Sequence, residues 1–238
     1  MTPQLVSYDF GAHNADLLKS ATRIMESGQW KRQRIVVILP ASNTMSTKVA
    51  LSHWNLIFPP NNAVSRILAV GMEVGEAYSQ AIEQVLAHPE LSQWEYVLTL
   101  EHDNVPPPDG VLKLLETMDA HPEYACVGGL YWTKGEGGVP QIWGDPNDPV
   151  LNFRPQPPRP GEVVECCGTG MGFNLWRMSM FRDPKLPRPL FRTKSSAEEG
   201  VGTQDLAFWG EARKHGYRCA VDCRVLVGHF DASQDMMW

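Results

Sequence analysis

The sequence predicts an α/β protein built in layers, and three observations favour this fold class. Segments with strand-like patterns alternate along the chain with segments whose apolar residues recur at helical spacing. The run from Ile35 to Leu39 is continuously apolar and mostly β-branched, which is typical of a strand covered on both faces. A chain of 238 residues that is 43% hydrophobic is also long enough to bury a sizeable core.

The expected elements follow one another from the N-terminus. Residues 1–33 are predicted to form a helical extension in which Asn14 caps an amphipathic helix. Residues 34–238 are predicted to form a single domain with proline-rich loops at about 135–161 and 182–202, long enough to be functional. Its first elements are expected as a strand at 35–39, a helix at 47–57, a strand at 65–70, a helix at 75–87, a strand at 96–100 and a helix capped by Asp109.

Composition and charge restrict the classes of protein that fit. Five cysteines, an odd number, do not form a disulfide framework and indicate a reducing compartment. No apolar run approaches the roughly 20 residues that span a bilayer. The N-terminus lacks the order of a signal peptide, so we expect a cytoplasmic protein without membrane insertion. The net charge of -6 argues against general binding of nucleic acid over the whole surface.

An apolar strand ends on two acidic residues in the stretch "YVLTLEHDNVPPP". Glu101 and Asp103 flank His102, and alternate residues of an extended chain point to the same face. The prolines from Pro106 to Pro108 then prevent regular structure from continuing. Sheets of this class bind ligands at the carboxyl ends of their strands, and Mg²⁺ or Mn²⁺ prefers oxygen ligands completed by substrate phosphates. The stretch therefore predicts a cation site, while a solvated acidic turn is the alternative.

The last third of the chain adds two further candidates. Asp205 lies in the first turn of a predicted helix that Thr203 caps and Gly216 ends, and His229 follows a predicted strand. An acid in a first turn also interacts favourably with the helix dipole. A single histidine after a strand is usually a polar edge residue, so position alone assigns neither residue a role.

Five motifs in a fixed order resemble those of GT-A glycosyltransferases of the large family 2-like group, over about residues 34–231. They are "LPAS", "VGEAYSQAIEQVL", "EHD" in place of the DxD motif, the glycine-rich "CGTGMGFNLWRMSMF", and "TQDLAFWGEARKHGYRCAVD". The resemblance implies a GT-A fold with a central, mixed but mostly parallel sheet flanked by helices. It also implies a metal-dependent enzyme that uses Mn²⁺ or Mg²⁺ and transfers a sugar from a nucleotide-diphosphate sugar, by default a UDP-sugar, to an acceptor hydroxyl.

The same resemblance implies roles for individual residues. Asp103 and His229 would hold the metal, and Glu101, which stands where the family more often has Asp, would bind it through water or bind the ribose. Asp205 would be the base that accepts the proton of the acceptor. The glycines of "GTGMGF" would form a wall beneath the sugar, or would simply allow close strand packing. Residues expected to border the nucleotide, diphosphate or sugar are Pro40, Ala41, Ser42, Glu73, Glu101, His102, Asp103 and Gly170.

Other classes of protein share some of these features. A sugar nucleotidyltransferase should carry a glycine-rich basic loop after its first strand, and "LPASNTMSTK" contains no glycine. The cysteines and His229 suggest a zinc module, but they lack paired C-x₂-C spacing. A non-catalytic nucleotide-sugar binding protein stays open as an alternative, because it would carry the same motifs and bind nucleotide without turnover.

A basic segment is the only clue to the acceptor. Such a strip can contact the phosphates of a nucleic acid or an anionic glycan. It suggests the hypothesis that the acceptor is a hydroxylated base in DNA. The alternatives are an ordinary ordered loop and a glycan, protein or small-molecule acceptor. Its basic residues are Arg182, Lys185, Arg188, Arg192 and Lys194, against the single acid Asp183.

Overall fold

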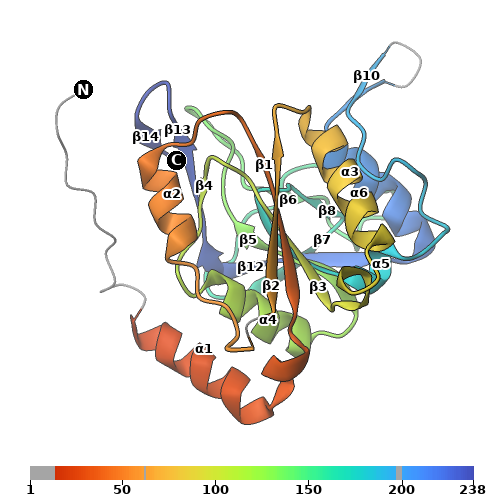
Figure 1. The fold of residues 1–238 in the computed structure, drawn as a ribbon. Helices are drawn as coiled ribbons and strands as arrows, with labels where there is room; N and C mark the ends of the chain where they lie inside the picture. Colours follow the sequence, from red (N-terminus) through yellow and green to blue (C-terminus); the bar gives the residue numbers. More distant parts are fainter. Residues whose placement is uncertain (1–13, 62, 197–199) are drawn as a thin grey trace.

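A seven-stranded sheet forms the centre of the protein (Figure 1). The computed structural model describes residues 14–61, 63–196 and 200–238. The strands of this sheet are β1 (Ile35–Ala41), β2 (Val64–Val70), β3 (Tyr96–Leu100), β5 (Tyr124–Leu130), β7 (Val163–Cys166), β9 (Phe173–Arg177) and β12 (Arg218–Leu226). They lie in the order β2-β1-β3-β9-β5-β12-β7.

The sheet is mixed but mostly parallel, as predicted. β1 pairs in parallel with β2 and β3, and β12 pairs in parallel with β5. Because β9 is antiparallel to both of its neighbours and β7 is antiparallel to β12, five of the seven strands point the same way. Short strands outside this sheet are β4 (Asn104–Val105), β6 (Ile142–Trp143), β8 (Gly168–Thr169), β10 (Lys194–Ser196), β11 (Gly200–Gly202), β13 (Gly228–Asp231) and β14 (Met236–Met237).

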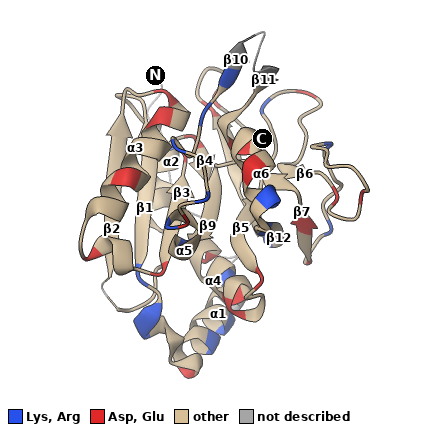
Figure 2. Cartoon of the chain, turned by 90° about the vertical axis from the view of Figure 1, so that its right-hand side faces the viewer, with Lys and Arg blue, Asp and Glu red and all other residues tan. Residues whose placement is uncertain are grey.

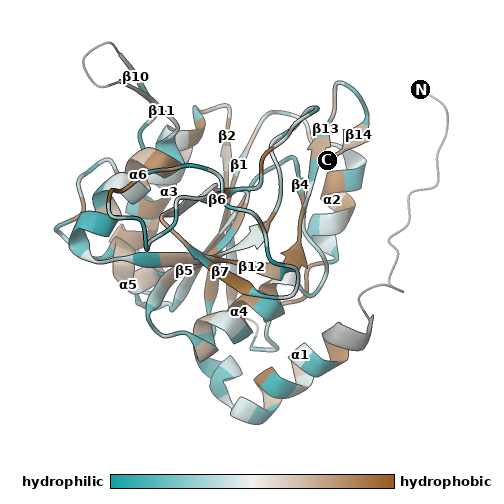
Figure 3. Ribbon diagram, turned by 180° about the vertical axis from the view of Figure 1, so that it is seen from behind, coloured by the Kyte–Doolittle hydropathy of each residue, from teal (hydrophilic) through white to brown (hydrophobic). Residues whose placement is uncertain are grey.

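Helices cover both faces of the sheet. One face is covered by α3 (Val74–Ala87), α5 (Met178–Phe181) and α6 (Gln204–Ala212). The other is covered by α1 (Asn14–Ser27) and α4 (Gly110–Ala120), while α2 (Thr47–Trp54) lies beside β4. Hydrophobic residues gather on the strands and on the inner faces of the helices (Figure 3). This is the three-layer arrangement expected when both faces of a sheet are apolar.

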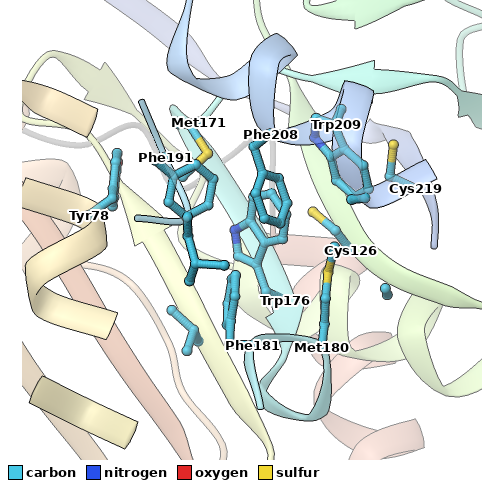
Figure 4. Close-up of a cluster of buried hydrophobic side chains, with 14 of the residues drawn as sticks. Tyr78, Cys126, Met171, Trp176, Met180, Phe181, Phe191, Phe208, Trp209 and Cys219 are labelled. Atoms are coloured by element: carbon cyan, nitrogen blue, oxygen red, sulfur yellow. The ribbon is translucent and has the colours of Figure 1, made fainter. Parts of the chain in front are cut away.

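One apolar core lies between the sheet and the helices α3 and α6, and it is rich in aromatic rings (Figure 4). Trp176 of β9 stacks on Trp209 of α6, with 5.3 Å between ring centroids. Phe191 and Phe208 pack beside them, with centroids 4.5 Å apart. Both tryptophans are fully buried. They therefore stabilise the core and offer no surface on which a sugar or base can stack.

All five cysteines are free and buried. Cys166 and Cys219 lie opposite each other on β7 and β12, with their sulfur atoms 3.7 Å apart. Burial raises the pKa of the Cys219 thiol well above its ordinary value. Within the described part of the chain, no three or more His, Cys, Asp or Glu side chains are grouped so as to hold a metal. The cysteines pack as core residues, and the zinc-module alternative finds no site there.

Two helix ends differ from the expectation. α2 ends at Trp54 rather than near 57: the side chain and the backbone amide of Asn55 both donate to the Leu51 carbonyl, at 2.9 and 3.1 Å, and the next backbone amide, of Leu56, donates to the His53 carbonyl at 3.4 Å instead of to the residue four positions back. Asp109 takes the N-cap position of α4, as predicted, but makes no capping hydrogen bond. Its carboxylate instead lies 2.9 Å from the Lys113 ammonium. The sequence predicted where α2 and α4 begin, while hydrogen bonds and ion pairs of individual side chains decided where α2 ends and how Asp109 is bound.

The N-terminal helix α1 packs on the domain. Ile24 is buried in the same apolar core as α4, and Arg23 forms an ion pair with Glu116 of α4. Packing therefore joins the predicted extension to the domain. The side chain of the predicted cap Asn14 lies outside the described residues. No described helix has the length and apolar character needed to cross a bilayer.

Two glycines test how the helical segment containing α6 is stabilised. The segment ends at Gly216, as predicted, in a left-handed conformation with φ +82°. Alanine is strained there, so we expect Gly216→Ala to lower the free energy of unfolding by about 1–2 kcal/mol. Gly210 lies inside α6, and a Cβ there would meet open space. Gly210→Ala should therefore raise stability by about 0.5–1 kcal/mol. Thermal denaturation of both variants checks the pair, and shifts of the same sign would contradict the prediction.

Candidate active site

The candidate site is built where β3 ends at the carboxyl edge of the sheet. The chain turns there, and the Asn104 amide donates to the Glu101 carbonyl at 3.1 Å. β4 then pairs antiparallel with β13, which places Asn104 opposite His229. The Phe230 amide also donates to the Asp103 carbonyl at 2.7 Å. These bonds hold the residues after β3 against a strand from the end of the chain.

Asp103 and His229 face each other in this arrangement. The Nε2 atom of His229 lies 3.4 Å from Oδ2 of Asp103, and its Nδ1 atom lies 2.8 Å from the carbonyl oxygen of Trp132. A carbonyl oxygen only accepts hydrogen bonds, so Nδ1 carries a proton and Nε2 is the ring atom left to face Asp103. A backbone carbonyl prepares histidine for metal ligation in this way.

Lys134 is a third member of this group, and it was not predicted from the sequence. Its Nζ atom lies 2.5 Å from the same Oδ2 atom of Asp103. Burial alone would raise the pKa of Asp103, but the hydrogen bonds and charges of His229 and Lys134 lower it well below its ordinary value. Asp103 is therefore an anion at neutral pH. The only sequence signal for Lys134 is its place beside the glycines of "KGEGG".

Glu101 follows directly on β3, before the turn that carries Asp103. The described residues contain no cluster of three or more potential metal-binding His, Cys, Asp or Glu side chains. Metal binding by Glu101 stays a prediction, but the strand alternation from which it was argued does not apply here. β3 ends at Leu100 and residues 102–103 form a turn, so the period-two alternation of a strand does not extend to Asp103.

The carboxyl group of Glu101 is nevertheless coupled to the site electrostatically. Burial raises its pKa to about 8, together with the charges of Asp103 and Asp205 and against the charge of Lys134. Glu101 is therefore mostly protonated at neutral pH. A protonated carboxyl donates a hydrogen bond, so Glu101 suits contact with a ribose or sugar hydroxyl better than direct ligation of a metal.

Glu101→Gln tests this protonation state through stability. The folded-state pKa of about 8 exceeds the ordinary value of about 4.3, so the wild type loses free energy of unfolding as the pH rises between them, by up to about 1.4 kcal/mol per pH unit. Glutamine mimics the protonated form and does not titrate. In urea denaturation with EDTA, the free energy of unfolding of the variant minus that of the wild type should therefore rise by at least about 1 kcal/mol between pH 5.5 and 7.5. A difference that is constant with pH would contradict the assignment.

Asp205 occupies the first turn of α6, as the spacing predicted. Its side chain is buried, with 8% of the residue exposed, and its Oδ1 atom accepts from the Leu206 amide at 2.8 Å. Burial raises the pKa of Asp205, although hydrogen bonds from Thr203 and the backbone oppose the rise. Its charge also raises the pKa of Glu101, so the two carboxyl groups are electrostatic neighbours. A buried carboxylate with a raised pKa suits proton acceptance.

The residues predicted at the end of the first strand lie at the same edge of the sheet. β1 and β3 are parallel neighbours with Ile38 opposite Thr99, so their carboxyl ends meet at one edge. Pro40 is buried, Ala41 ends the strand and is partly exposed, and Ser42 is exposed just beyond it. The structure therefore places Pro40, Ala41 and Ser42 on the side of the sheet where Glu101 lies.

Glu73 is also at this edge, as the N-cap of α3. Its carboxylate accepts from the Glu76 amide at 2.9 Å and from the Thr193 hydroxyl at 2.8 Å. Burial would raise the pKa of Glu73, but these hydrogen bonds and a further one from Gly75 lower it. Glu73 thus has a structural role in starting α3 and in holding the segment that contains Thr193.

His102 and Gly170 take positions that the motifs did not specify. His102 is near His53 of α2, whose pKa is lowered by burial and by the charge of His102. A Cβ atom at Gly170 would collide with the Tyr131 hydroxyl and the Gln141 side chain. Gly170 is therefore required for close packing, which favours that interpretation over an open wall beneath a sugar.

The basic segment of residues 182–194 uses part of its charge internally. Arg188 pairs with Glu83 at 2.7 Å and donates to the Phe181 carbonyl at 2.6 Å. Arg182 donates to the Trp94 carbonyl at 3.5 Å. Figure 2 shows Lys and Arg interspersed with Asp and Glu over the described residues. Two of the five predicted contacts to an anionic acceptor thus hold the segment itself in place.

Solved structures of other proteins share this fold. A197 from STIV is 16% identical to this chain, with a TM-score of 0.60 over 86% of this chain and 92% of its own. GalNAc-T7, solved with UDP, GalNAc and Mn²⁺, is 11% identical, with a TM-score of 0.54 over 83% of this chain and 44% of its own. No protein-family model and no curated protein matches the sequence. The chain has a GT-A-like glycosyltransferase fold, as its motifs predicted.

Proposed function

We propose that this protein is a metal-dependent glycosyltransferase that moves a sugar from a nucleotide-diphosphate sugar to a hydroxyl group. One observation carries the proposal: Asp103 Oδ2 and His229 Nε2 face each other 3.4 Å apart at the carboxyl end of β3. Ligands of α/β sheets bind at this edge. A UDP-sugar is the first donor to test, because GalNAc-T7, which has a similar fold, was solved with UDP.

These two donor atoms fit Mn²⁺ or Mg²⁺. Ligands about 2.1 Å from one ion at right angles lie about 3 Å apart, close to the 3.4 Å that separates Asp103 Oδ2 from His229 Nε2. Such ions use few protein ligands and complete their shell with water and substrate phosphates, so a third protein ligand is not required. A bound ion would neutralise the charge that develops on the leaving diphosphate.

Side chains of the protein would supply the remaining chemistry. Transfer breaks the bond between the anomeric carbon and the diphosphate, and the sugar becomes oxocarbenium-like. Asp205 would accept the proton of the attacking hydroxyl as the new glycosidic bond forms. Glu101, protonated near neutral pH because its pKa is about 8, would donate a hydrogen bond to the ribose or the sugar.

The acceptor class is the finer part of this proposal. The exposed residue Lys185 supports an anionic acceptor such as a hydroxylated base in DNA, although Arg182 and Arg188 contact their own chain. Binding of duplex DNA in a mobility-shift assay, weakening from low to moderate salt, would support that acceptor. If duplex DNA shows no salt-sensitive binding, the acceptor should instead be sought among glycans, proteins and small molecules.

Calorimetric titration tests the donor side directly. Nucleoside diphosphates and nucleotide-sugars are titrated with and without Mn²⁺, and we expect at least one to bind only when Mn²⁺ is present. Absence of binding for every nucleotide would overturn the proposal. Metal-dependent binding without turnover, even with many acceptors, would identify the alternative, a non-catalytic nucleotide-sugar binding protein.

A further inference from the structure

Two groups of the chain meet at one oxygen atom of the site. Oδ2 of Asp103 lies 2.5 Å from the Lys134 ammonium and 3.4 Å from Nε2 of His229. A divalent cation shared by Asp103 and His229 would sit beside that ammonium. Like charges at such short range repel each other when solvent screens them only partly. The lysine in this position and a metal on the same oxygen therefore exclude each other.

Lys134 is carried by a turn that is closed on itself. The Thr133 amide donates to the Val139 carbonyl at 3.0 Å, and the Val139 amide donates to the Thr133 hydroxyl at 2.9 Å. Between them Gly135 and Gly137 have φ values of +99° and +77°, and a Cβ atom on either would meet no atom within 4 Å. Lys134 can therefore leave Asp103 by a movement of this turn without unpacking neighbouring side chains.

We propose that Lys134 is a tethered counter-cation that occupies the cation position at Asp103 and competes there with the divalent metal. The Trp132 carbonyl that orients His229 belongs to the same hairpin. This carbonyl lies outside the part of the turn that is closed by the hydrogen bonds between Thr133 and Val139. His229 therefore keeps its orientation when Lys134 moves away from Asp103. The site is then never an uncompensated anion, and metal binding exchanges one cation for another.

This exchange couples the metal to the donor, a step that rests on the proposed function. A displaced ammonium needs a new anionic partner, and a diphosphate bound beside the metal supplies strong acceptor oxygens. Metal binding without nucleotide is therefore weakened by the lysine, while metal binding with diphosphate is not. Lys134 makes the two ligands bind cooperatively, in the sense that each favours the other.

The experiment is a Mn²⁺ titration without nucleotide, in which the EPR signal of free Mn²⁺ reports the bound fraction. Lys134→Gln should bind Mn²⁺ about tenfold more tightly than the wild type, because the competing charge is gone. Lys134→Arg keeps the charge and should bind as weakly as the wild type. Lys214→Gln is the matched control, since it removes a lysine that lies 2.8 Å from the Glu211 carboxylate outside the site, and it should leave Mn²⁺ binding unchanged.

Equal or weaker Mn²⁺ binding by a folded Lys134→Gln variant would overturn the inference. Nucleotide binding by the wild type in EDTA, unchanged by Mn²⁺, would also overturn it, because Lys134 would then be the working cation. The proposed function is judged separately by Mn²⁺-dependent binding of UDP to the wild type. If UDP does not bind while Lys134→Gln still gains affinity for Mn²⁺, the proposed function fails and the competition at Asp103 stands.

Discussion

Asp103→Ala is expected to abolish metal-dependent nucleotide binding while the protein stays folded. Oδ2 of Asp103 is the atom that His229 and Lys134 both approach, so its removal leaves one imidazole nitrogen to hold the ion. A hard cation that prefers oxygen ligands is not retained by a single imidazole. We expect the affinity of a nucleoside diphosphate in the presence of Mn²⁺ to fall by about 100-fold or more, measured by calorimetric titration.

Asp231→Ala is the matched control for this loss. Asp231 lies on β13 with His229, and its carboxylate accepts hydrogen bonds from Ser233 rather than from the site. The control variant should bind nucleotide as the wild type does. Wild-type binding by Asp103→Ala would remove Asp103 from the site. A loss accompanied by unfolding, seen in the circular dichroism spectrum, would show that Asp103 is structural.

The central sheet could be predicted because its strands carry their own signal. Strands covered on both faces read as continuous apolar runs, and the runs at β1 and β3 fall where the sequence placed them. Gly216 likewise marked the end of a helical segment through its left-handed conformation. These features depend on local residue types and can be read one segment at a time.

The site was harder to predict because it depends on contacts between distant segments. Strand alternation suggested that Glu101 and Asp103 lie on one face, but the strand ends at Leu100 and the chain turns at residues 102–103. Asp103 instead meets His229 from the last strands and Lys134 from the turn after β5. No periodicity in the sequence links these residues. Only the order of the motifs connected Asp103 with His229, and no motif connected Lys134 with either residue.

Side-chain partners also decided features that composition left open. Trp176 and Trp209 fall in proposed site segments, yet they stack on each other in the core. Arg188 belongs to the basic segment, yet Glu83 and a backbone carbonyl bind its guanidinium. Composition counts a charge or a ring without showing what it contacts. For this reason the fold could be predicted more completely than the roles of individual side chains.

Asp205→Asn is expected to leave donor binding intact and to lose transfer. The substitution keeps the shape of the side chain but removes the carboxylate that would accept the proton, which lowers the rate by about 10²–10⁴-fold. Because burial raises the pKa of Asp205, the wild-type rate should fall as the pH drops through that pKa. This acidic limb of the pH–rate profile should be absent from the variant. Release of UDP from a UDP-sugar, with water as the acceptor, measures both effects before the natural acceptor is identified.

Two comparisons separate catalysis by Asp205 from a contribution to the helix. Loss of an acid from a first turn costs about 0.3–1 kcal/mol of stability, so Asp205→Asn should remain folded with nearly wild-type thermal denaturation. Glu211→Gln removes a carboxylate from the last part of the same helix, where it pairs with Lys214, and should leave the rate unchanged. If Asp205→Asn keeps its rate and its pH limb, another group is the base. Equal loss of donor binding and of transfer would instead place Asp205 in the donor site, because an interaction that serves only the acceptor's proton leaves the affinity for the nucleotide untouched.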